Sequence, residues 1–348
     1  MSFIKGIELC RRFHTEVVEP LMMEDYHHLS YSSALVGPGS EVLGYDTEMS
    51  TDHDWGPRVY LFLDQQIIDE YAEQIQASLQ ERAPERLYGF QLDIRRIVIT
   101  TVPGFIESIL AISRAEPIEP LDWLTFPSQS LLEITRGAVY RDDHGQLAKM
   151  REKFEYYPHD IWLYLMASCW QRIGQEEHLM LRSGFMGDEL GSALIASRLV
   201  RDIMNLGFLM ERHYAPYPKW FGTAFKHLKC SGELMPHLWK AQTASAWRER
   251  EHAFHKVYEH LSRMHNELNI TENIAKDVSY FYDRPFKVMN GEGIARRLAD
   301  QIINTDLHQL AGQRLIGSID LITDNTDFRT MKYARNELKA LFKSAIRD

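Results

Sequence analysis

The hydrophobic pattern of this sequence changes near residue 125, and the change limits the folds that the chain can adopt. Before it, short apolar runs typical of strands are separated by turns and by one helical stretch that ends at Pro84. After it, long segments repeat apolar side chains at helical spacing: residues 160–182, 187–214, 236–268 and 327–346. The 348 residues also exceed the usual size of one core. The sequence therefore predicts an α+β protein, with a small mixed-sheet domain at residues 1–125 and a helical domain at residues 126–348.

The expected first domain has a simple order of elements. A helix is predicted from Ile4 to about Met23, because apolar residues recur there at roughly helical spacing. Strands are predicted at residues 33–36, 58–63 and 95–101. Beyond this domain, residues 137–148 are rich in turn-forming residues, so we expect a short hairpin or loop there, at the junction.

Charge and cysteine content argue against several classes of protein. The chain has 39 lysines and arginines against 49 aspartates and glutamates, which disfavours general binding to the phosphates of nucleic acids. Its three cysteines are too widely spaced for a disulfide framework or a CxxC metal site. The sequence shows no signal peptide and no apolar run long enough to span a membrane. We therefore expect a cytoplasmic protein with no membrane partner.

The segment GPGSEVLGYDTEMSTDHDWG, residues 37–56, places two carboxylates just ahead of an apolar run. If Asp52 and Asp54 begin a strand, they project to the same face, because alternate side chains of a strand share a face. Two carboxylates held that close repel each other unless a cation lies between them, and Mg2+ prefers oxygen ligands. Asp52 and Asp54 are therefore the candidate metal ligands.

Small residues ahead of this acidic pair indicate what the metal would accompany. Gly37, Gly39 and Ser40 follow the apolar run SALV. Glycine lets the backbone come close to a phosphate, and a serine hydroxyl can bind a phosphate oxygen. The spacing therefore predicts a phosphate and its metal ion side by side.

This arrangement resembles the nucleotidyltransferase superfamily built on the DNA polymerase β palm. The signature of that superfamily is a glycine followed by glycine or serine and then, after a short gap, Asp-x-Asp or Asp-x-Glu. Gly39 and Ser40 match its first part, and Asp52 and Asp54 match its second. The resemblance implies that Gly39 and Ser40 contact the triphosphate and that Asp52 and Asp54 are catalytic and hold the metal.

The resemblance extends to the helical half. Taken with residues 187–225, the sequence looks like a bacterial family in which a minimal nucleotidyltransferase domain precedes a helical region. That region is comparable to the one in aminoglycoside nucleotidyltransferases. The resemblance therefore implies a polymerase β palm-like domain followed by a helical substrate-binding domain.

The superfamily also has a third carboxylate, which helps to activate the attacking hydroxyl. It comes from a later strand, but the run at residues 95–101 has arginines and apolar residues where an acid is expected. Asp93 lies just before this run and is the nearest candidate for the third catalytic residue. Five other acids stay open for the role: Glu107, Glu176, Glu177, Asp188 and Glu189.

The loop YAPYPKW, residues 214–220, combines prolines, aromatic residues and a lysine. It could present Lys219 to a triphosphate, and Tyr217 or Trp220 to a base. An ordinary rigid loop between helices explains the same residues, so both interpretations stay open.

Four histidines in the segment 236–268 invite a metal hypothesis that helical geometry does not support. At roughly 100° per residue they scatter around the helix instead of sharing one face. We therefore expect them to be solvent-exposed side chains. They are His252, His255, His260 and His265.

Taken together, these features predict an Mg2+-dependent nucleotidyltransferase that uses two Mg2+ ions. It would move a nucleoside monophosphate, AMP from ATP in the simplest case, onto a hydroxyl or phosphate of an acceptor and release pyrophosphate. Three acceptors stay open: a cationic small molecule such as an aminoglycoside, a protein hydroxyl, and a tRNA end in a local basic pocket. The alternative is a non-catalytic nucleotide-binding or nucleotide-sensing protein with the same fold.

Overall fold

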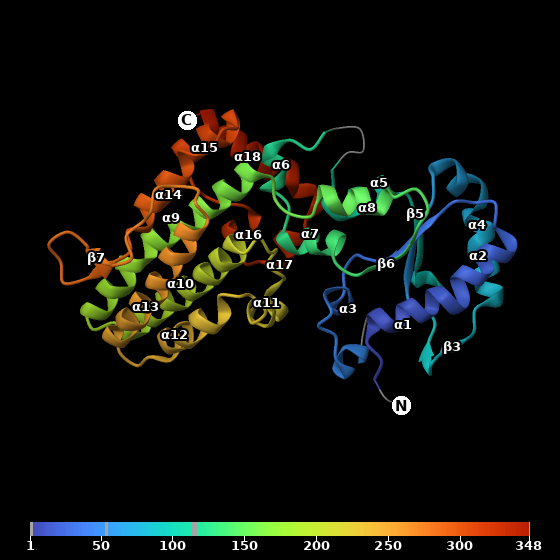
Figure 1. Ribbon diagram of the computed structural model, residues 1–348, viewed down its shortest axis with the longest axis horizontal. Helices are drawn as coiled ribbons and strands as arrows, with labels where there is room; N and C mark the ends of the chain where they lie inside the picture. The colour runs from blue at the N-terminus through green and yellow to red at the C-terminus, as the bar shows by residue number, and fades with distance from the viewer. Residues whose placement is uncertain (1–2, 53–54, 113–116, 348) are drawn as a thin grey trace. The chain divides into compact units, whose positions relative to one another are not determined.

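The computed structural model (Figure 1) shows a mixed α/β protein. It describes residues 3–52, 55–112 and 117–347. Helices predominate in these ranges, and a small mixed sheet lies in the N-terminal half, as the sequence predicts. None of the described helices is both long enough and apolar enough to span a lipid bilayer.

The chain forms two compact units, and it crosses between them more than once. Residues 1–117 and 129–155 make up the first unit, whereas residues 118–128 and 156–348 make up the second. This division differs from the single boundary predicted near residue 125. The reason is that part of the segment 129–155 is a strand of the sheet, and this ties the whole segment to the first unit.

The sheet of the first unit has four strands in the order β5-β2-β1-β6. Its strands are β1 (Ser32–Leu35), β2 (Val59–Phe62), β5 (Ile97–Thr100) and β6 (Ala138–Asp142). β1 is antiparallel to both β2 and β6, and β2 is parallel to β5. The three strands predicted from the sequence therefore exist, and the sheet is mixed.

Strand β6 corrects the prediction of a hairpin or loop at residues 137–148. Asp142, the last residue of β6, and Asp143, which follows it, accept hydrogen bonds from Ser32 of β1 and from Tyr31, just before β1. The Ser32 hydroxyl donates to Asp142 Oδ1 over 2.8 Å, and the Tyr31 amide donates to Asp143 Oδ2 over 3.0 Å. Residues that commonly form turns thus hold an edge strand in register here.

Helices cover this sheet, and their apolar faces form its core. The helical elements are α1 (Gly6–Phe13), a π-helical segment (His14–Val18), α2 (Glu19–Asp25), α3 (Ser40–Leu43), a 3-10 helix (Glu48–Asp52), α4 (Gln65–Arg82), a second 3-10 helix (Ile94–Arg96), α5 (Val102–Leu110), α7 (Ser128–Thr135) and α8 (Gln146–Lys153). A hairpin of β3 (Arg86–Leu87) and β4 (Phe90–Gln91) follows α4. Leu9 of α1 and Leu79 of α4 pack in one buried cluster with Val59 and Leu61 of β2. The segment between β1 and β2 is therefore attached to a rigid core.

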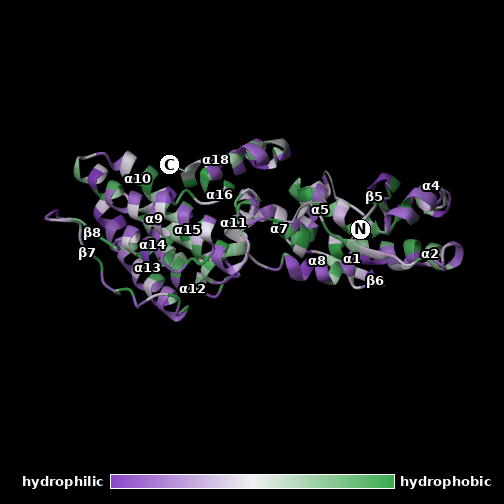
Figure 2. Ribbon diagram, turned by 90° about the horizontal axis from the view of Figure 1, so that it is seen from above, coloured by the Kyte–Doolittle hydropathy of each residue, from purple (hydrophilic) through white to green (hydrophobic). Residues whose placement is uncertain are grey.

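The second unit is helical and is built around one long helix, α9 (His159–Phe185). Residues 161–170 of α9 are all buried. The other helices are α6 (Pro120–Trp123), α10 (Glu189–Met210), α11 (Pro218–Phe225), α12 (Ser231–Thr243), α13 (Trp247–Glu267), α14 (Gly291–Ala299), α15 (Thr305–Gln313), α16 (Ile319–Ile322), α17 (Thr326–Thr330), a 3-10 helix (Lys332–Ala334) and α18 (Arg335–Arg347). A short hairpin of β7 (Ser279–Tyr280) and β8 (Lys287–Val288) precedes α14. Figure 2 shows hydrophobic and hydrophilic residues side by side along the long helices, the pattern of helices that are buried on one side.

Candidate functional site

The turn after β1 has a backbone that requires glycine at two positions. Gly37 has a φ of 84° and Gly39 a φ of 135°, both in the region that side chains disfavour. A β-carbon added to Gly39 would lie 2.5 Å from Glu41 Oε2. Ser40 then begins α3, and its hydroxyl makes no hydrogen bond to any described residue. A ligand can therefore approach the backbone of this turn and the Ser40 hydroxyl with no side chain of residue 39 in between.

A buried ion pair holds this turn against the start of β2. Arg58 Nε lies 2.9 Å from Glu41 Oε1, and the two side chains are only 10% and 2% exposed. The Arg58 guanidinium also donates to the carbonyl oxygen of Pro38. Since β1 and β2 are antiparallel, the end of β1 meets the start of β2, which brings Arg58 to the turn.

A second buried carboxylate, that of Asp46, fixes the middle of the segment. Its Oδ2 accepts the backbone N–H of Gly6 over 2.6 Å and the indole N–H of Trp55 over 3.1 Å. Lys5 Nζ lies 3.5 Å from its Oδ1. Asp46 therefore caps the N-terminus of α1 and ties the segment to that helix.

Sequence reasoning missed Glu41, Asp46 and Arg58. Charged side chains are rarely fully buried unless they are paired, and nothing in the spacing of these three identifies their partners. The available signal was indirect: an acid follows Ser40 directly, and a lone arginine stands at the start of an apolar strand.

The structure places Asp52 outside the strand on which it was predicted. Asp52 is exposed at the end of the 3-10 helix Glu48–Asp52, and β2 begins only at Val59. Gly56, with a φ of 141°, and Pro57 lie between them. Because proline has no N–H for a strand pair, pairing cannot extend back through this position. The argument that alternate strand residues share a face therefore does not apply to Asp52.

Of the two predicted metal ligands, the structure describes Asp52 only. Asp54 lies outside the described residues, so the paired carboxylates cannot be measured as a pair. Within the described ranges, no group of three or more His, Cys, Asp or Glu side chains could hold a metal ion. The chemistry of the two aspartates still fits Mg2+, because carboxylate oxygens are the hard donors it prefers.

Asp93, predicted as the third catalytic acid, lies before β5 and caps the 3-10 helix Ile94–Arg96. Its Oδ1 accepts the N–H of Arg95 over 3.0 Å, and its Oδ2 pairs with the Arg95 guanidinium over 2.9 Å. These hydrogen bonds hold the pKa of Asp93 below its usual value. β5 itself carries no acid. Asp93 therefore stays ionised and engaged with its neighbour in sequence.

The other candidates for a third acid are spread over both units. Glu107 lies on α5 and is exposed. In the second unit, Glu176 pairs with Arg198, Glu189 pairs with Arg250, and Asp188 caps α10 by accepting the N–H of Gly191 over 2.7 Å. These three candidates of the second unit thus already serve as a helix cap or as ion-pair partners.

Glu177 is the exception, because its carboxyl group is buried among backbone amides. Its Oε2 accepts the N–H of Met289 over 2.6 Å and its Oε1 that of Gly291 over 3.1 Å. The side chain lies in the tightly packed region between α9 and α14, where a β-carbon on Gly174 would lie 2.5 Å from the nitrogen of Glu292. Burial raises the pKa of Glu177 to about 7.

We expect Glu177 to make stability depend on pH. Its folded pKa of about 7 exceeds the value of 4.5 for an unperturbed glutamate. The stabilisation is therefore complete below about pH 4.5 and is lost as the pH rises through 7. Relative to the parent, Glu177→Gln should gain stability as the pH rises from 5 to 7, because it lacks this loss; urea titrations at several pH values would measure the difference in the free energy of unfolding. An equal slope in both proteins would contradict this assignment.

Residues 123–221 match the model described as Domain of unknown function (DUF4037). The match includes α9 and α10 and covers less than half of the chain. A search of the curated proteins found no match. The description of the matched family names no activity.

Lys219, predicted to contact the triphosphate, belongs to the second unit. It is the second residue of α11 and is exposed, with Nζ 5.0 Å from the centroid of the Trp220 ring. Tyr217 occupies the N-cap position of this helix. Gly39, Ser40 and Asp52 lie together on one segment of the first unit, and Lys219 is not part of that segment.

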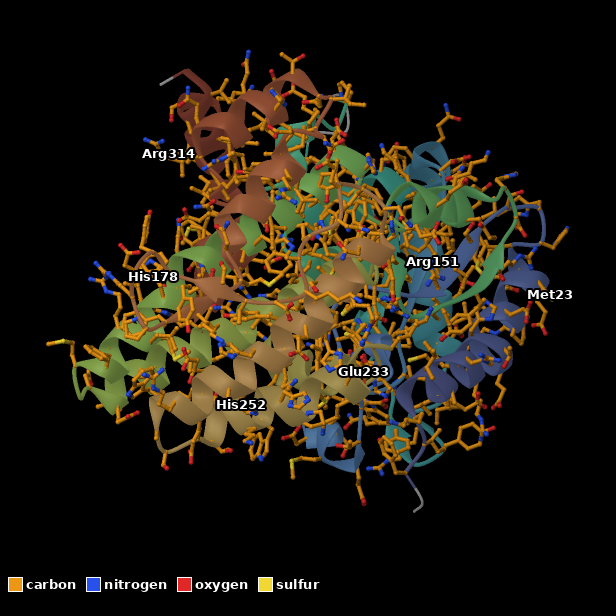
Figure 3. All side chains as sticks on the ribbon, turned by 60° about the vertical axis from the view of Figure 1, so that its left-hand side comes forward. Met23, Arg151, His178, Glu233, His252 and Arg314 are labelled. Carbon is orange, nitrogen blue, oxygen red and sulfur yellow. The ribbon has the colours of Figure 1, made fainter. Side chains whose placement is uncertain are left out.

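The histidines of α13 differ from the expectation that all are exposed. His252, labelled in Figure 3, is exposed, but His265 is only 1% exposed. Burial lowers the pKa of His265 to about 4, so this ring is neutral at physiological pH. His265 contacts the ring of Trp170, which makes it a core residue.

Proposed function

We propose that this chain is an Mg2+-dependent nucleotidyltransferase whose nucleotide site is the segment from Gly37 to Arg58. One observation carries the proposal. The glycine turn follows the end of β1, and the segment containing Asp52 leads into the start of β2. Because β1 and β2 are antiparallel neighbours, these two ends lie at the same edge of the mixed sheet. That is the placement in which a phosphate-binding turn and metal-binding carboxylates can act on one triphosphate.

Each residue of the site has a distinct role in this proposal. The backbone around Gly39 and the Ser40 hydroxyl bind phosphate oxygens. Asp52 and Asp54 hold Mg2+, which when bound supplies positive charge to the phosphates. The buried Arg58 keeps the turn in place through its bonds to Glu41 and Pro38. We place this activity in the cytoplasm, where the free thiols of the three cysteines would stay reduced.

A second candidate function rests on the missing acid of β5. Nucleotidyl transfer needs a base to take the proton of the attacking hydroxyl, and Asp93 is engaged by Arg95. A protein that binds a nucleotide at the same turn without transferring it would need no such base. Binding and transfer must therefore be measured separately.

We expect Gly39→Ala to weaken the binding of Mg-ATP by about tenfold or more. The added β-carbon would meet the Glu41 carboxylate, and the φ of 135° would strain any side chain. Gly44→Ala is the matched control, because Gly44 also has a positive φ, of 78°, but has nothing within 4 Å of an added β-carbon. Calorimetric titration with Mg-ATP measures both variants. If Gly39→Ala binds Mg-ATP as tightly as the parent, this turn is not the phosphate site.

A further inference from the structure

Tyr60, the second residue of β2, places a phenol beside the glycine turn. Its backbone pairs with Ala34 of β1, shortly before Gly37. A β-carbon added to Gly37 would lie 3.1 Å from the Tyr60 hydroxyl oxygen and 3.5 Å from the nearest ring carbons. Glycine at position 37 therefore lets this hydroxyl lie against the backbone of the turn. Since Arg58 donates to the carbonyl of Pro38, two side chains from the start of β2 reach consecutive residues of the turn.

The ring of Tyr60 is held in place by other aromatic rings. Its centroid lies 5.2 Å from that of Phe105 on α5, with the two rings at 68°. It also stacks on Phe62 of its own strand, with centroids 6.0 Å apart at 18°. Phe62 and Phe105 are both buried. Because packed aromatic rings have little freedom to turn aside, the hydroxyl has a fixed position beside the turn.

The Tyr60 hydroxyl makes no hydrogen bond to any described residue. Unlike the Tyr31 hydroxyl, which is buried without a partner, it is not sealed from solvent. Burial of the ring raises the pKa of Tyr60 above its ordinary value; Arg58 opposes this shift and Glu133 adds to it. The phenol therefore keeps its proton at physiological pH and can donate it to a ligand.

The backbone of the turn lacks a donor at the place where Tyr60 supplies one. The N–H of Gly37 already donates to the carbonyl oxygen of Glu133 over 2.7 Å. Phosphate oxygens are acceptors, and hydrogen bonds to such anions are stronger than those between neutral groups. A phosphate at this turn thus meets the Tyr60 hydroxyl where the Gly37 amide is engaged.

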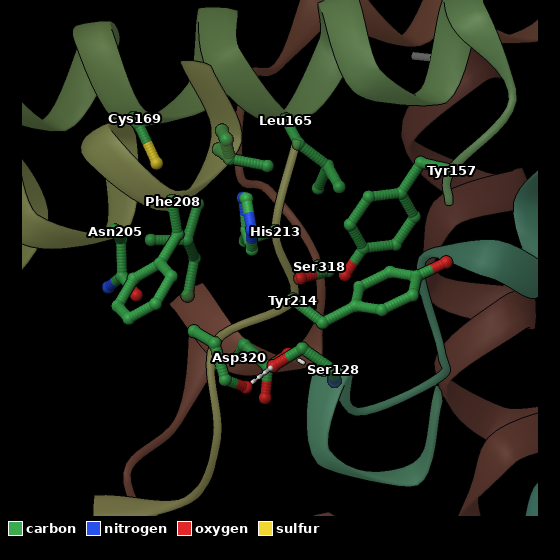
Figure 4. A pocket seen from close by; sticks show the side chains of 13 residues that line it. Ser128, Tyr157, Leu165, Cys169, Asn205, Phe208, His213, Tyr214, Ser318 and Asp320 are labelled. Atoms are coloured by element: carbon green, nitrogen blue, oxygen red, sulfur yellow. Dashed lines mark hydrogen bonds between the residues drawn. The ribbon is translucent and has the colours of Figure 1, made fainter. Parts of the chain in front are cut away.

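Ser128 in the second unit shows how a hydroxyl beside a hollow is satisfied by the protein itself (Figure 4). Its hydroxyl donates to the carbonyl oxygen of Ala215 over 2.7 Å, and its N–H donates to Asp320 Oδ2 over 2.7 Å. Tyr60 differs, because no described residue accepts its hydrogen bond. Its free donor lies beside the turn that we assign to phosphate.

We propose that the Tyr60 hydroxyl donates a hydrogen bond to the triphosphate of the bound nucleotide. It acts beside the Ser40 hydroxyl and the backbone around Gly39, and this role rests on the nucleotide site proposed above. Arg58 has a different task, because its guanidinium is engaged by Glu41 and by the carbonyl of Pro38. Arg58 thus holds the turn, whereas Tyr60 contacts the ligand.

Calorimetric titration of Tyr60→Phe with Mg-ATP and with Mg-tripolyphosphate tests this role. We expect both ligands to bind about tenfold more weakly than to the parent, because a hydrogen bond to a charged group is lost. The melting temperature without ligand should change by less than about 2 °C, since phenylalanine keeps the ring contacts and no internal hydrogen bond is lost. Tyr88→Phe is the control: Tyr88 is in the same unit, but its hydroxyl donates to Glu16 over 2.6 Å. It should bind both ligands like the parent.

The parent and the variant together show which assignment fails. A parent that does not bind Mg-ATP would contradict the nucleotide site and the role of Tyr60 together. If the parent binds Mg-ATP and Tyr60→Phe binds it as tightly, the nucleotide site stands and only the role of Tyr60 is wrong. Weaker binding of Mg-ATP with unchanged binding of Mg-tripolyphosphate would place the hydroxyl at the nucleoside, which also overturns its assignment to the triphosphate.

Discussion

Replacing Asp52 and Asp54 together by asparagine should abolish nucleotidyl transfer and leave the protein folded. Asparagine keeps the shape of each side chain but removes the charge that would hold Mg2+. Losing that cation beside the leaving pyrophosphate should lower the rate by about 10³-fold or more. Because Asp52 is exposed, its replacement should change the free energy of unfolding by less than about 0.5 kcal/mol. Pyrophosphate release from Mg-ATP, measured with pools of cationic small molecules, proteins and tRNA, gives the rate.

The control for this experiment is Glu48→Gln, which removes an exposed charge from the same 3-10 helix. Mg-ATP should raise the melting temperature of the parent and of this control, because a ligand that binds only the folded state stabilises it. The asparagine double variant should lose that shift. A double variant that still transfers nucleotide would refute the assignment of Asp52 and Asp54. A parent that shows the shift but no transfer to any pool would favour the non-catalytic alternative.

Hydrophobic periodicity was enough to predict the framework of the first unit but not its edge. β1, β2, β5 and α4 have clear apolar patterns, and the structure contains all four. β6 was missed because it ends in Asp142 and is followed by Asp143, both typical turn residues, whereas its pairing with β1 and the bonds of these two acids to Ser32 and Tyr31 make it a strand. Its membership in the sheet depends on a contact between residues far apart in sequence, which periodicity does not record.

Periodicity also fails to show where one helix of the helical half ends and the next begins, because it does not record contacts between residues far apart in sequence. Residues 236–268 have one continuous helical pattern, yet the chain leaves the helix between Thr243 and Trp247. No glycine or proline marks the break. Instead, Arg250 donates to the carbonyl of Ala244, and Glu249 accepts the N–H of Ser245. Contacts of the following helix thus outweigh the local helix propensity of this connection.

The sequence pattern also did not reveal which charged side chains of the candidate site are buried and paired. Arg58→Met should destabilise the first unit by about 3–5 kcal/mol, because it leaves the Glu41 carboxylate buried without a counter-charge. It also removes the donor to the Pro38 carbonyl. Arg95→Met is the matched control: Arg95 is in the same unit and also pairs with an acid, but its side chain is 90% exposed. Its loss should change the free energy of unfolding by less than about 1 kcal/mol.

Glu41→Gln in the Arg58→Met background tests whether the unpaired charge is the cause. Neutralising Glu41 removes the buried charge, so the double variant should be more stable than Arg58→Met alone, although Glu41→Gln by itself should destabilise the parent. Because the chain has two compact units, hydrogen exchange of the amides in β1 and β2 is the measurement that reports on the first unit alone. If the effects of the two substitutions simply add, Arg58 and Glu41 do not stabilise each other. The turn at Gly39 would then have to be held by the Arg58 bond to Pro38 alone.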